Sequence, residues 1–188
     1  MRLVDVSRRD SSQETHMPAR PSSRKPIPID VQVRVLFRDG WLCRWCHRPT
    51  VFSPAFKLLE RFVRKEGWQT PIAYFHPNWR RDAAPLLDHL GAVIDHVEAY
   101  STGGLHGEAN FVTSCNKCNA RKNSRPAKEY ELERPGLPVK GRFGEPKHWD
   151  GLVSLFLVLA PQDTLTVSER SWERAFRRYL AQPSAKQG

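Results

Sequence analysis

Four cysteines give the clearest chemical signal in the sequence, because they fall in two Cys-x-x-Cys pairs. The pairs are Cys43 with Cys46 and Cys115 with Cys118, and the chain contains no other cysteine. Two thiolates from one tight turn can bind the same ion, so two such pairs complete the tetrahedral shell that Zn²⁺ prefers. A shell closed by four cysteines leaves no position for water, so we expect a structural zinc site and not a catalytic one.

Paired thiols also occur in redox proteins, which form reversible disulfides and hold no zinc tightly. The 68 residues between the pairs, 47–114, exceed the spacing of a usual zinc ribbon. We favour the zinc site because no fifth cysteine competes for the pairing. Metal analysis of the purified protein separates the two hypotheses.

A second group of polar residues lies between the cysteine pairs and around the second one. It comprises Asp95, His96, Asn110 and the run CNKCNARK at residues 115–122. A neutral imidazole deprotonates water near pH 7, and carboxylate and carboxamide oxygens suit Mg²⁺ or Mn²⁺. Basic side chains beside them would hold a phosphate. The combination indicates metal-assisted chemistry on a phosphate group.

These residues resemble the HNH nuclease family. The similarity runs through RVLFRDGWLCRWC at 34–46, IDHV at 94–97, GG at 103–104, NFV at 110–112 and CNKCNARK at 115–122. The blocks extend over about half the chain and leave a gap across 50–90, which is longer than in minimal members of the family. The last position of the His-Asn-His signature is Asn119, a frequent variant that still offers an oxygen ligand.

The resemblance implies a ββα-metal fold, in which two strands and a helix surround one divalent ion and the zinc site clamps the motif from outside. It implies that His96 is the general base for the attacking water and that Asp95 and Asn119 hold the catalytic Mg²⁺ or Mn²⁺. Asn110 would hold the loop that orients the His96 ring. Arg121, Lys122 and His106 are further candidates for contact with phosphate or DNA, although His106 also suits an exposed loop position.

The charge of the chain favours a polyanionic partner. Among 188 residues, 30 Lys and Arg stand against 20 Asp and Glu, which gives a formal net charge of +10. Such a surface attracts nucleic acid. Together with the resemblance, it leads us to expect an endonuclease that acts on double-stranded DNA. We expect weak sequence preference, because no segment resembles a base-reading module. A non-catalytic zinc-dependent nucleic-acid-binding module and an RNA-directed nuclease are the alternatives. A homodimer is compatible with the sequence and would be needed for a double-strand cut by one site per chain.

No segment of the sequence suits a membrane or a secretion signal. The longest apolar run, 152–160, is interrupted by Ser154 and is far shorter than the roughly 20 residues that a spanning helix needs. The first residues, MRLVD, lack the apolar stretch of a signal peptide. We therefore expect a cytoplasmic protein with no membrane contact.

The expected fold class is α+β, an HNH core with additional helices at its N-terminus, in its insertion and at its C-terminus. Residues 1–26 are predicted to be a flexible basic tail, 27–133 the nuclease domain with its insertion at 50–90, and 134–188 a helical extension. Within the core, we expect a strand, a loop, a second strand at 110–113 and a helix from about Cys115. Apolar residues at every odd position from 27 to 37 suit a strand, whereas Leu36 and a cap at Asp30 suit a helix.

The flanking helices are predicted from caps and apolar periodicity. They are expected at 53–67, with Ser53 as the cap, at 82–90, at 149–160 and at 168–180, the last with a capping box of Thr166 and Glu169. No helix is expected directly after Pro126, where the chain turns polar. The aromatic residues Trp41, Trp45, Tyr74, Phe75 and Trp79 could stack on bases, but packing against apolar neighbours is favoured.

Overall fold

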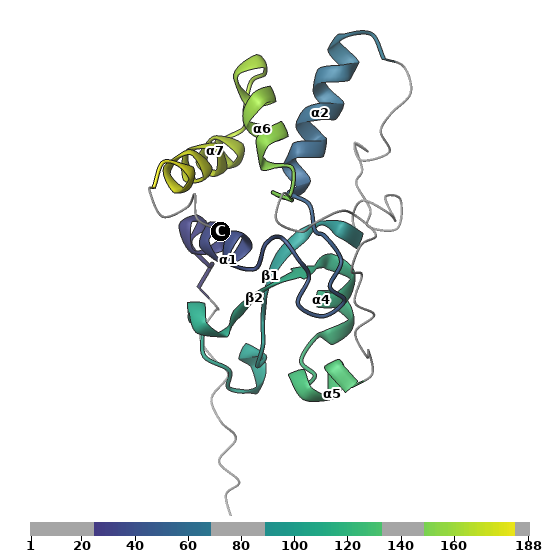
Figure 1. The fold of residues 1–188 in the computed structure, drawn as a ribbon, viewed down its shortest axis with the longest axis vertical. Helices are drawn as coiled ribbons and strands as arrows, with labels where there is room; N and C mark the ends of the chain where they lie inside the picture. Colours follow the sequence, from purple (N-terminus) through teal and green to yellow (C-terminus); the bar gives the residue numbers. More distant parts are fainter. Residues whose placement is uncertain (1–24, 69–88, 133–148, 183–188) are drawn as a thin grey trace, which may run out of the picture.

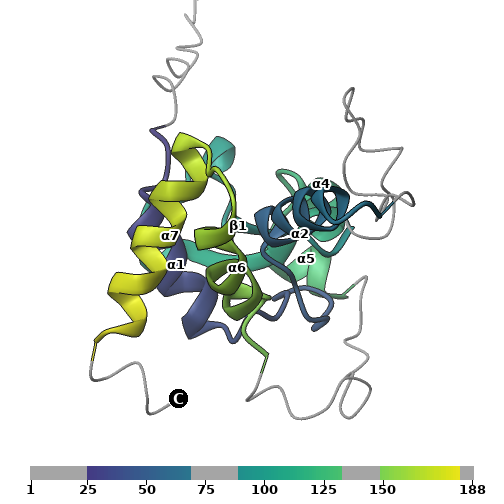
Figure 2. The same ribbon diagram turned by 90° about the horizontal axis from the view of Figure 1, so that it is seen from above.

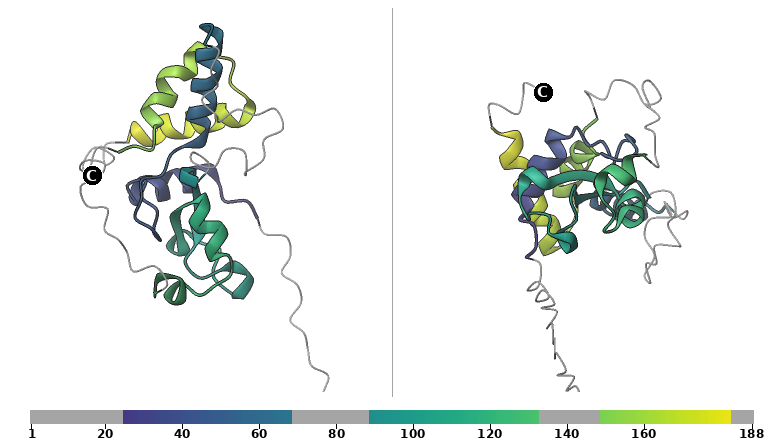
Figure 3. Two further views of the ribbon diagram at one scale, coloured as in Figure 1. Left: turned by 90° about the vertical axis from the view of Figure 1, so that its right-hand side faces the viewer. Right: turned by 90° about the horizontal axis from the view of Figure 1, so that it is seen from below.

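The computed structural model describes residues 25–68, 89–132 and 149–182. The elements in chain order are α1 (Ile29–Arg38), α2 (Ser53–Lys65), β1 (Ala92–His96), η2 (Tyr100–Thr102), η3 (Glu108–Asn110), β2 (Phe111–Cys115), α4 (Asn116–Lys122), α5 (Ala127–Leu132), α6 (Val153–Leu159), η5 (Ala160–Gln162) and α7 (Val167–Leu180). The predicted α+β class is confirmed. Helices α2, α6 and α7 gather at one end and the β1–β2 hairpin with α4 and α5 at the other (Figures 1 and 3).

The segment that allowed two interpretations is the helix α1. Its inward side carries Val33 and Leu36, which are buried, and Ile29 and Phe37, which pack on the same core. The helix begins at Ile29 after Pro28, so the predicted cap at Asp30 is wrong. The chain leaves α1 through a turn in which Gly40 has a φ of 60°, a backbone conformation that glycine adopts without strain.

The sheet is a single antiparallel pair, β1 with β2, in which Ala92 lies opposite Cys115 and His96 opposite Phe111. Backbone groups on the outer edge of β2 form hydrogen bonds with side chains at the end of α1 and in the turn after it. The guanidinium of Arg38 donates to Phe111 O at 2.6 Å, and Thr113 N donates to Asp39 Oδ2 at 2.7 Å. These bonds protect an edge that would otherwise present unpaired backbone groups.

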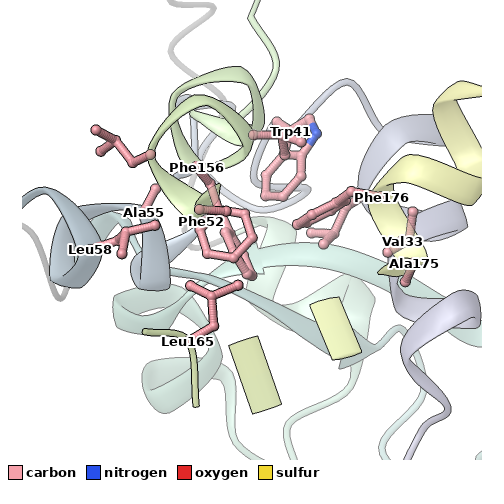
Figure 4. Packing of buried hydrophobic residues seen from close by; sticks show 13 residues of the cluster. Val33, Trp41, Phe52, Ala55, Leu58, Phe156, Leu165, Ala175 and Phe176 are labelled. Atoms are coloured by element: carbon pink, nitrogen blue, oxygen red, sulfur yellow. The ribbon is translucent and has the colours of Figure 1, made fainter. Parts of the chain in front are cut away.

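The main core joins helices from the two ends of the sequence. Figure 2 shows α7 lying along α1, and Figure 4 shows aromatic rings filling the space between the helices. The ring of Phe52 meets that of Phe156 at 5.1 Å and that of Phe176 at 4.9 Å, both edge to face. Gly151, with a φ of 67°, lies against Trp41, where a Cβ would come within 2.1 Å of the indole. Gly151 is therefore required on both conformational and packing grounds.

The flanking helices agree with most of the sequence predictions. The capping box of Thr166 and Glu169 is present on α7. Ser53 is the first residue of α2 and not its cap, and α6 starts only at Val153 because Gly151 and Leu152 both have a positive φ. Helix α5 was not predicted. The helix predicted at 82–90 lies, apart from its last two residues, outside the described ranges.

Within the described ranges, no helix combines the length and the apolar character that crossing a bilayer requires.

Candidate metal centre and catalytic site

The four cysteines come together in one cluster. Cys43 and Cys46 lie in the turn after α1, Cys115 ends β2 and Cys118 lies in the first turn of α4. Their Sγ atoms all lie within 4.8 Å of one another, and the distance between Cys46 Sγ and Cys115 Sγ is 3.9 Å. Tetrahedral Zn²⁺ with bonds of about 2.3 Å places its sulfurs about 3.8 Å apart. The thiols form no disulfide, so the cluster is compatible with a zinc site.

The surroundings of the cluster fix its geometry and favour loss of a proton. Arg44 N donates to Thr113 O at 2.8 Å, which ties the first cysteine turn to β2. Hydrogen bonds from the thiols of Cys115, Cys118 and Cys46 lower the pKa of Cys43, whereas hydrogen bonds with the other thiols raise the pKa of Cys115, so the first proton leaves Cys43. A thiol that deprotonates readily is suited to binding a cation, because the thiolate is the ligand form.

His96 lies at the end of β1 with only 3% of its surface exposed. Its ring stacks on that of His106 with a centroid distance of 5.4 Å, and His96 Nε2 lies 3.2 Å from His106 Nδ1. The edge of the same ring meets Phe111 at 4.9 Å. The structure therefore brings His106, a residue of the glycine-containing loop, directly against His96.

Asp95 precedes His96 and is also buried, with 8% of its surface exposed. Its Oδ2 accepts a hydrogen bond from Trp45 Nε1 at 2.9 Å, and its Oδ1 accepts one from His96 N at 2.7 Å. Burial raises the pKa of Asp95, although the charge of Lys122 and the bond from Trp45 oppose that effect. Each oxygen retains a further lone pair, so the carboxylate can still act as a ligand.

Asn110 closes the loop that connects the two strands. Its Oδ1 accepts from Glu98 N at 2.9 Å, while its Nδ2 donates to Glu98 O at 2.9 Å and to Leu105 O at 2.8 Å. These three bonds join the start of the loop, just after His96, to the residue before His106. The side chain thus holds the loop that carries one histidine against the other.

Helix α4 packs against both strands, and the three candidate site residues on it differ in their exposure to solvent. Lys122 has no exposed surface, and its Nζ donates to His96 O at 2.8 Å and lies 3.9 Å from Asp95 Oδ2. This position differs from the predicted phosphate contact, because a buried ammonium bonded to the strand has no access to a substrate. Arg121 is exposed, and the side chain of Asn119 is half-buried, with no side-chain hydrogen bond in the described part of the chain.

Sequence reasoning missed two supports of this site. Trp45 was assigned to packing, yet its N–H also bonds Asp95. The other support is the ion pair between Arg34 and Glu108, at 2.7 Å, which joins α1 to the turn η3. The position of Trp45 between two cysteines was the available signal, since an indole beside a metal turn is both rigid and a hydrogen-bond donor.

Strand β1, a loop, strand β2 and helix α4 form a ββα arrangement, which the four-cysteine cluster joins to the turn after α1. Residues 86–125, which contain both strands and α4 but not Cys43 and Cys46, match the family model described as HNH endonuclease. The match confirms the resemblance inferred from the sequence and indicates nuclease activity in general terms. Neither the comparison with curated proteins nor the comparison with solved structures gave a significant match.

Proposed function

We propose that the protein is a divalent-metal-dependent endonuclease that hydrolyses phosphodiester bonds in DNA, with His96 as general base. The observation that carries the proposal is the contact between α4 and the end of β1. Because Lys122 Nζ bonds His96 O at 2.8 Å, the inner face of α4 is fixed beside Asp95 and His96. Asn119 lies one turn before Lys122 on the same face.

In this proposal, Zn²⁺ occupies the four-cysteine cluster and has a structural role. The spacing of the sulfurs suits a tetrahedral ion, and all four ligand positions belong to the protein. The ion would join the turn that follows α1 to β2 and α4, three segments that share no continuous secondary structure.

A second, divalent ion would be held by the carboxylate of Asp95 and the carboxamide of Asn119. The donor set fits, since both groups offer hard oxygens with a free lone pair. When bound, Mg²⁺ or Mn²⁺ would stabilise the charge that develops on the phosphate and on the leaving oxygen.

The protein's own groups would supply the proton transfer and the alignment. His96 would accept a proton from the attacking water, with its ring fixed by His106 and Phe111. Asn110 would keep the loop closed around this pair. Arg121, exposed on α4, would contact the phosphate backbone, and the net charge of +10 would strengthen binding to DNA at low salt.

The test is cleavage of supercoiled plasmid by purified protein in Mg²⁺, in Mn²⁺ and in EDTA. Wild-type protein is expected to convert the plasmid to open-circle or linear DNA only with metal. His96→Ala should lower the rate at least about 100-fold, the scale of general-base catalysis, and leave DNA binding intact. His89→Ala is the matched control and should cut normally.

Three outcomes would change the proposal. A His96→Ala variant that cuts at the wild-type rate would remove the assigned role of His96. A folded, zinc-containing wild-type protein that binds DNA and cuts in no metal would favour the non-catalytic binding module. Cleavage of RNA under the same conditions, with DNA left intact, would change the substrate class.

A further inference from the structure

We propose that Trp45 is a positioning residue, through which the cysteine turn fixes the carboxylate of Asp95 and thereby sets the affinity for the catalytic divalent ion. The inference rests on the proposed function, because it takes Asp95 as a ligand of that ion. It adds a link between the two metal positions of the molecule that the sequence did not indicate.

The link begins in the first cysteine turn. Trp45 lies between Cys43 and Cys46 and immediately before the latter, so a metal bound by the four cysteines would also fix the backbone of Trp45. Its side chain points into the protein, with 3% of the residue exposed. From there, Nε1 reaches across to β1 and donates to Asp95 Oδ2 at 2.9 Å in a buried setting.

The indole has little freedom to move. Tyr130 of α5 meets its ring edge to face at 5.7 Å, and Lys122 Nζ of α4 lies 5.2 Å from the ring centroid. The same ammonium bonds His96 O. Trp45 is therefore packed between α4 and α5, and α5 contributes the aromatic ring on one side of the indole.

The consequence for Asp95 follows from the torsion of its carboxylate. This terminal torsion has a broad energy minimum, so a carboxylate takes a defined orientation only when its oxygens are both held. His96 N holds Oδ1 and Trp45 Nε1 holds Oδ2. Removal of the indole N–H leaves Oδ2 with only the more distant Lys122 Nζ, at 3.9 Å, so the carboxylate is held at Oδ1 alone and its orientation is less restricted. Loss of such a partner behind a metal ligand typically weakens metal affinity by about 10- to 100-fold.

The experiment measures Mn²⁺ binding by electron paramagnetic resonance on full-length, zinc-loaded protein, independently of any cleavage. Trp45→Phe removes the N–H and keeps an aromatic ring. It should raise the dissociation constant for Mn²⁺ at least about tenfold, with one zinc per chain retained. Asp95→Asn identifies the Mn²⁺ signal that belongs to the site.

Trp41→Phe is the matched control. Trp41 is equally buried, at 1% exposed, but lies in the helical core, and its Nε1 has no hydrogen-bond partner among the described residues. It should change stability and leave Mn²⁺ affinity unchanged. Should Trp45→Phe lose zinc, benzothienylalanine at position 45 replaces the N–H with sulfur at nearly constant shape, and the same tenfold weakening is expected.

The outcomes separate this inference from the proposed function. If Asp95→Asn weakens Mn²⁺ binding but neither change at Trp45 does, the positioning role is wrong and the metal site stands. If wild type and Asp95→Asn bind Mn²⁺ alike, Asp95 is not a ligand, and the inference fails together with that part of the proposed function.

Discussion

At the scale of single residues, the catalytic proposal depends on two imidazoles that face each other. His96 Nε2 and His106 Nδ1 are 3.2 Å apart, so one nitrogen donates the proton and the other accepts it. A base whose ring is oriented by a third group is a recurring arrangement for activating a nucleophile. In the proposed mechanism, His106 would fix the orientation of the His96 ring.

His106→Ala should lower the rate of plasmid cleavage about tenfold, because the ring of His96 loses the partner that fixes its orientation. His106→Asn should retain most of the rate, since its carboxamide places a polar atom close to the position of Nδ1. Steady-state cleavage of one plasmid by both variants makes the comparison. Equal rates for wild type and His106→Ala would contradict the role.

A second prediction for a single residue concerns the contribution of Lys122 to stability. It is buried beside Asp95 and bonded to β1, so Lys122→Met would leave the buried carboxylate without its nearest cation. The free energy of unfolding should fall by about 3 kcal/mol, as when one partner of a buried ion pair is removed, and the pKa of Asp95 should rise further. Urea denaturation measures the loss. Lys117→Met, at the start of the same helix, is the control and should cost little.

At the scale of elements, the sequence predicted those whose signals have one interpretation. The capping box of α7 is an example, because its two hydrogen bonds require both Thr166 and Glu169 at their spacing. Helix α1 could not be decided, because Ile29, Val33 and Phe37 are four residues apart and so fit both a strand and a helix. Helix α5 has six residues, which is too short for a periodic signal.

The same limit applies within the site. Cysteine spacing predicted the four-cysteine cluster, because two Cys-x-x-Cys pairs have few functions other than metal binding and redox chemistry. Which residues of α4 turn inward was not predictable, since Lys122 is buried only through contacts with β1 and Trp45, which are distant in sequence. The hydrogen bond between Trp45 and Asp95 also joins residues that are distant in sequence, so the sequence alone did not predict it.

The metal cluster gives the prediction at this scale. Cys115→Ser should lower the zinc content and the Tm together, because Cys115 ends β2 and its bond to the proposed zinc ion would join the sheet to the first cysteine turn. Zinc analysis and thermal unfolding measure the two quantities. Removal of zinc from the wild type with a chelator should lower its Tm to a similar value. A variant with full zinc and an unchanged Tm would show that the cluster is not structural.

At the scale of the whole molecule, α6 and α7 share one core with α1 and α2. The two ends of the described chain therefore form a single folded body, to which the β1–β2 hairpin is attached. A charged cluster reinforces that core. Arg61 of α2 pairs with Asp163, after η5, at 2.7 Å and with Glu169 of α7 at 3.0 Å. Lys65 joins the same Asp163. These ion pairs therefore join α2 to the C-terminal helices.

This cluster predicts a loss of stability in acid. Hydrogen bonds from Arg61 and Lys65 lower the pKa of Asp163. Burial raises the pKa of Glu169, but bonds from Arg61 and Thr166 outweigh burial and leave it lowered. A carboxylate with a lowered pKa binds protons less readily when folded, so its stabilisation is present above its unfolded pKa and disappears as the pH falls below about 4.

Arg61→Met should therefore lower the Tm at pH 7 by roughly 4–8 °C, for a loss of about 2 kcal/mol. It should also make the Tm less dependent on pH below about 4, because the carboxylates then titrate closer to their unfolded values. Arg177→Met, which breaks an exposed pair with Glu173 at 2.9 Å, is the control and should shift the Tm by about 1–2 °C at most. A wild-type Tm that stays constant from pH 7 to pH 3 would contradict the stabilising role of the cluster, since protonation would then remove nothing.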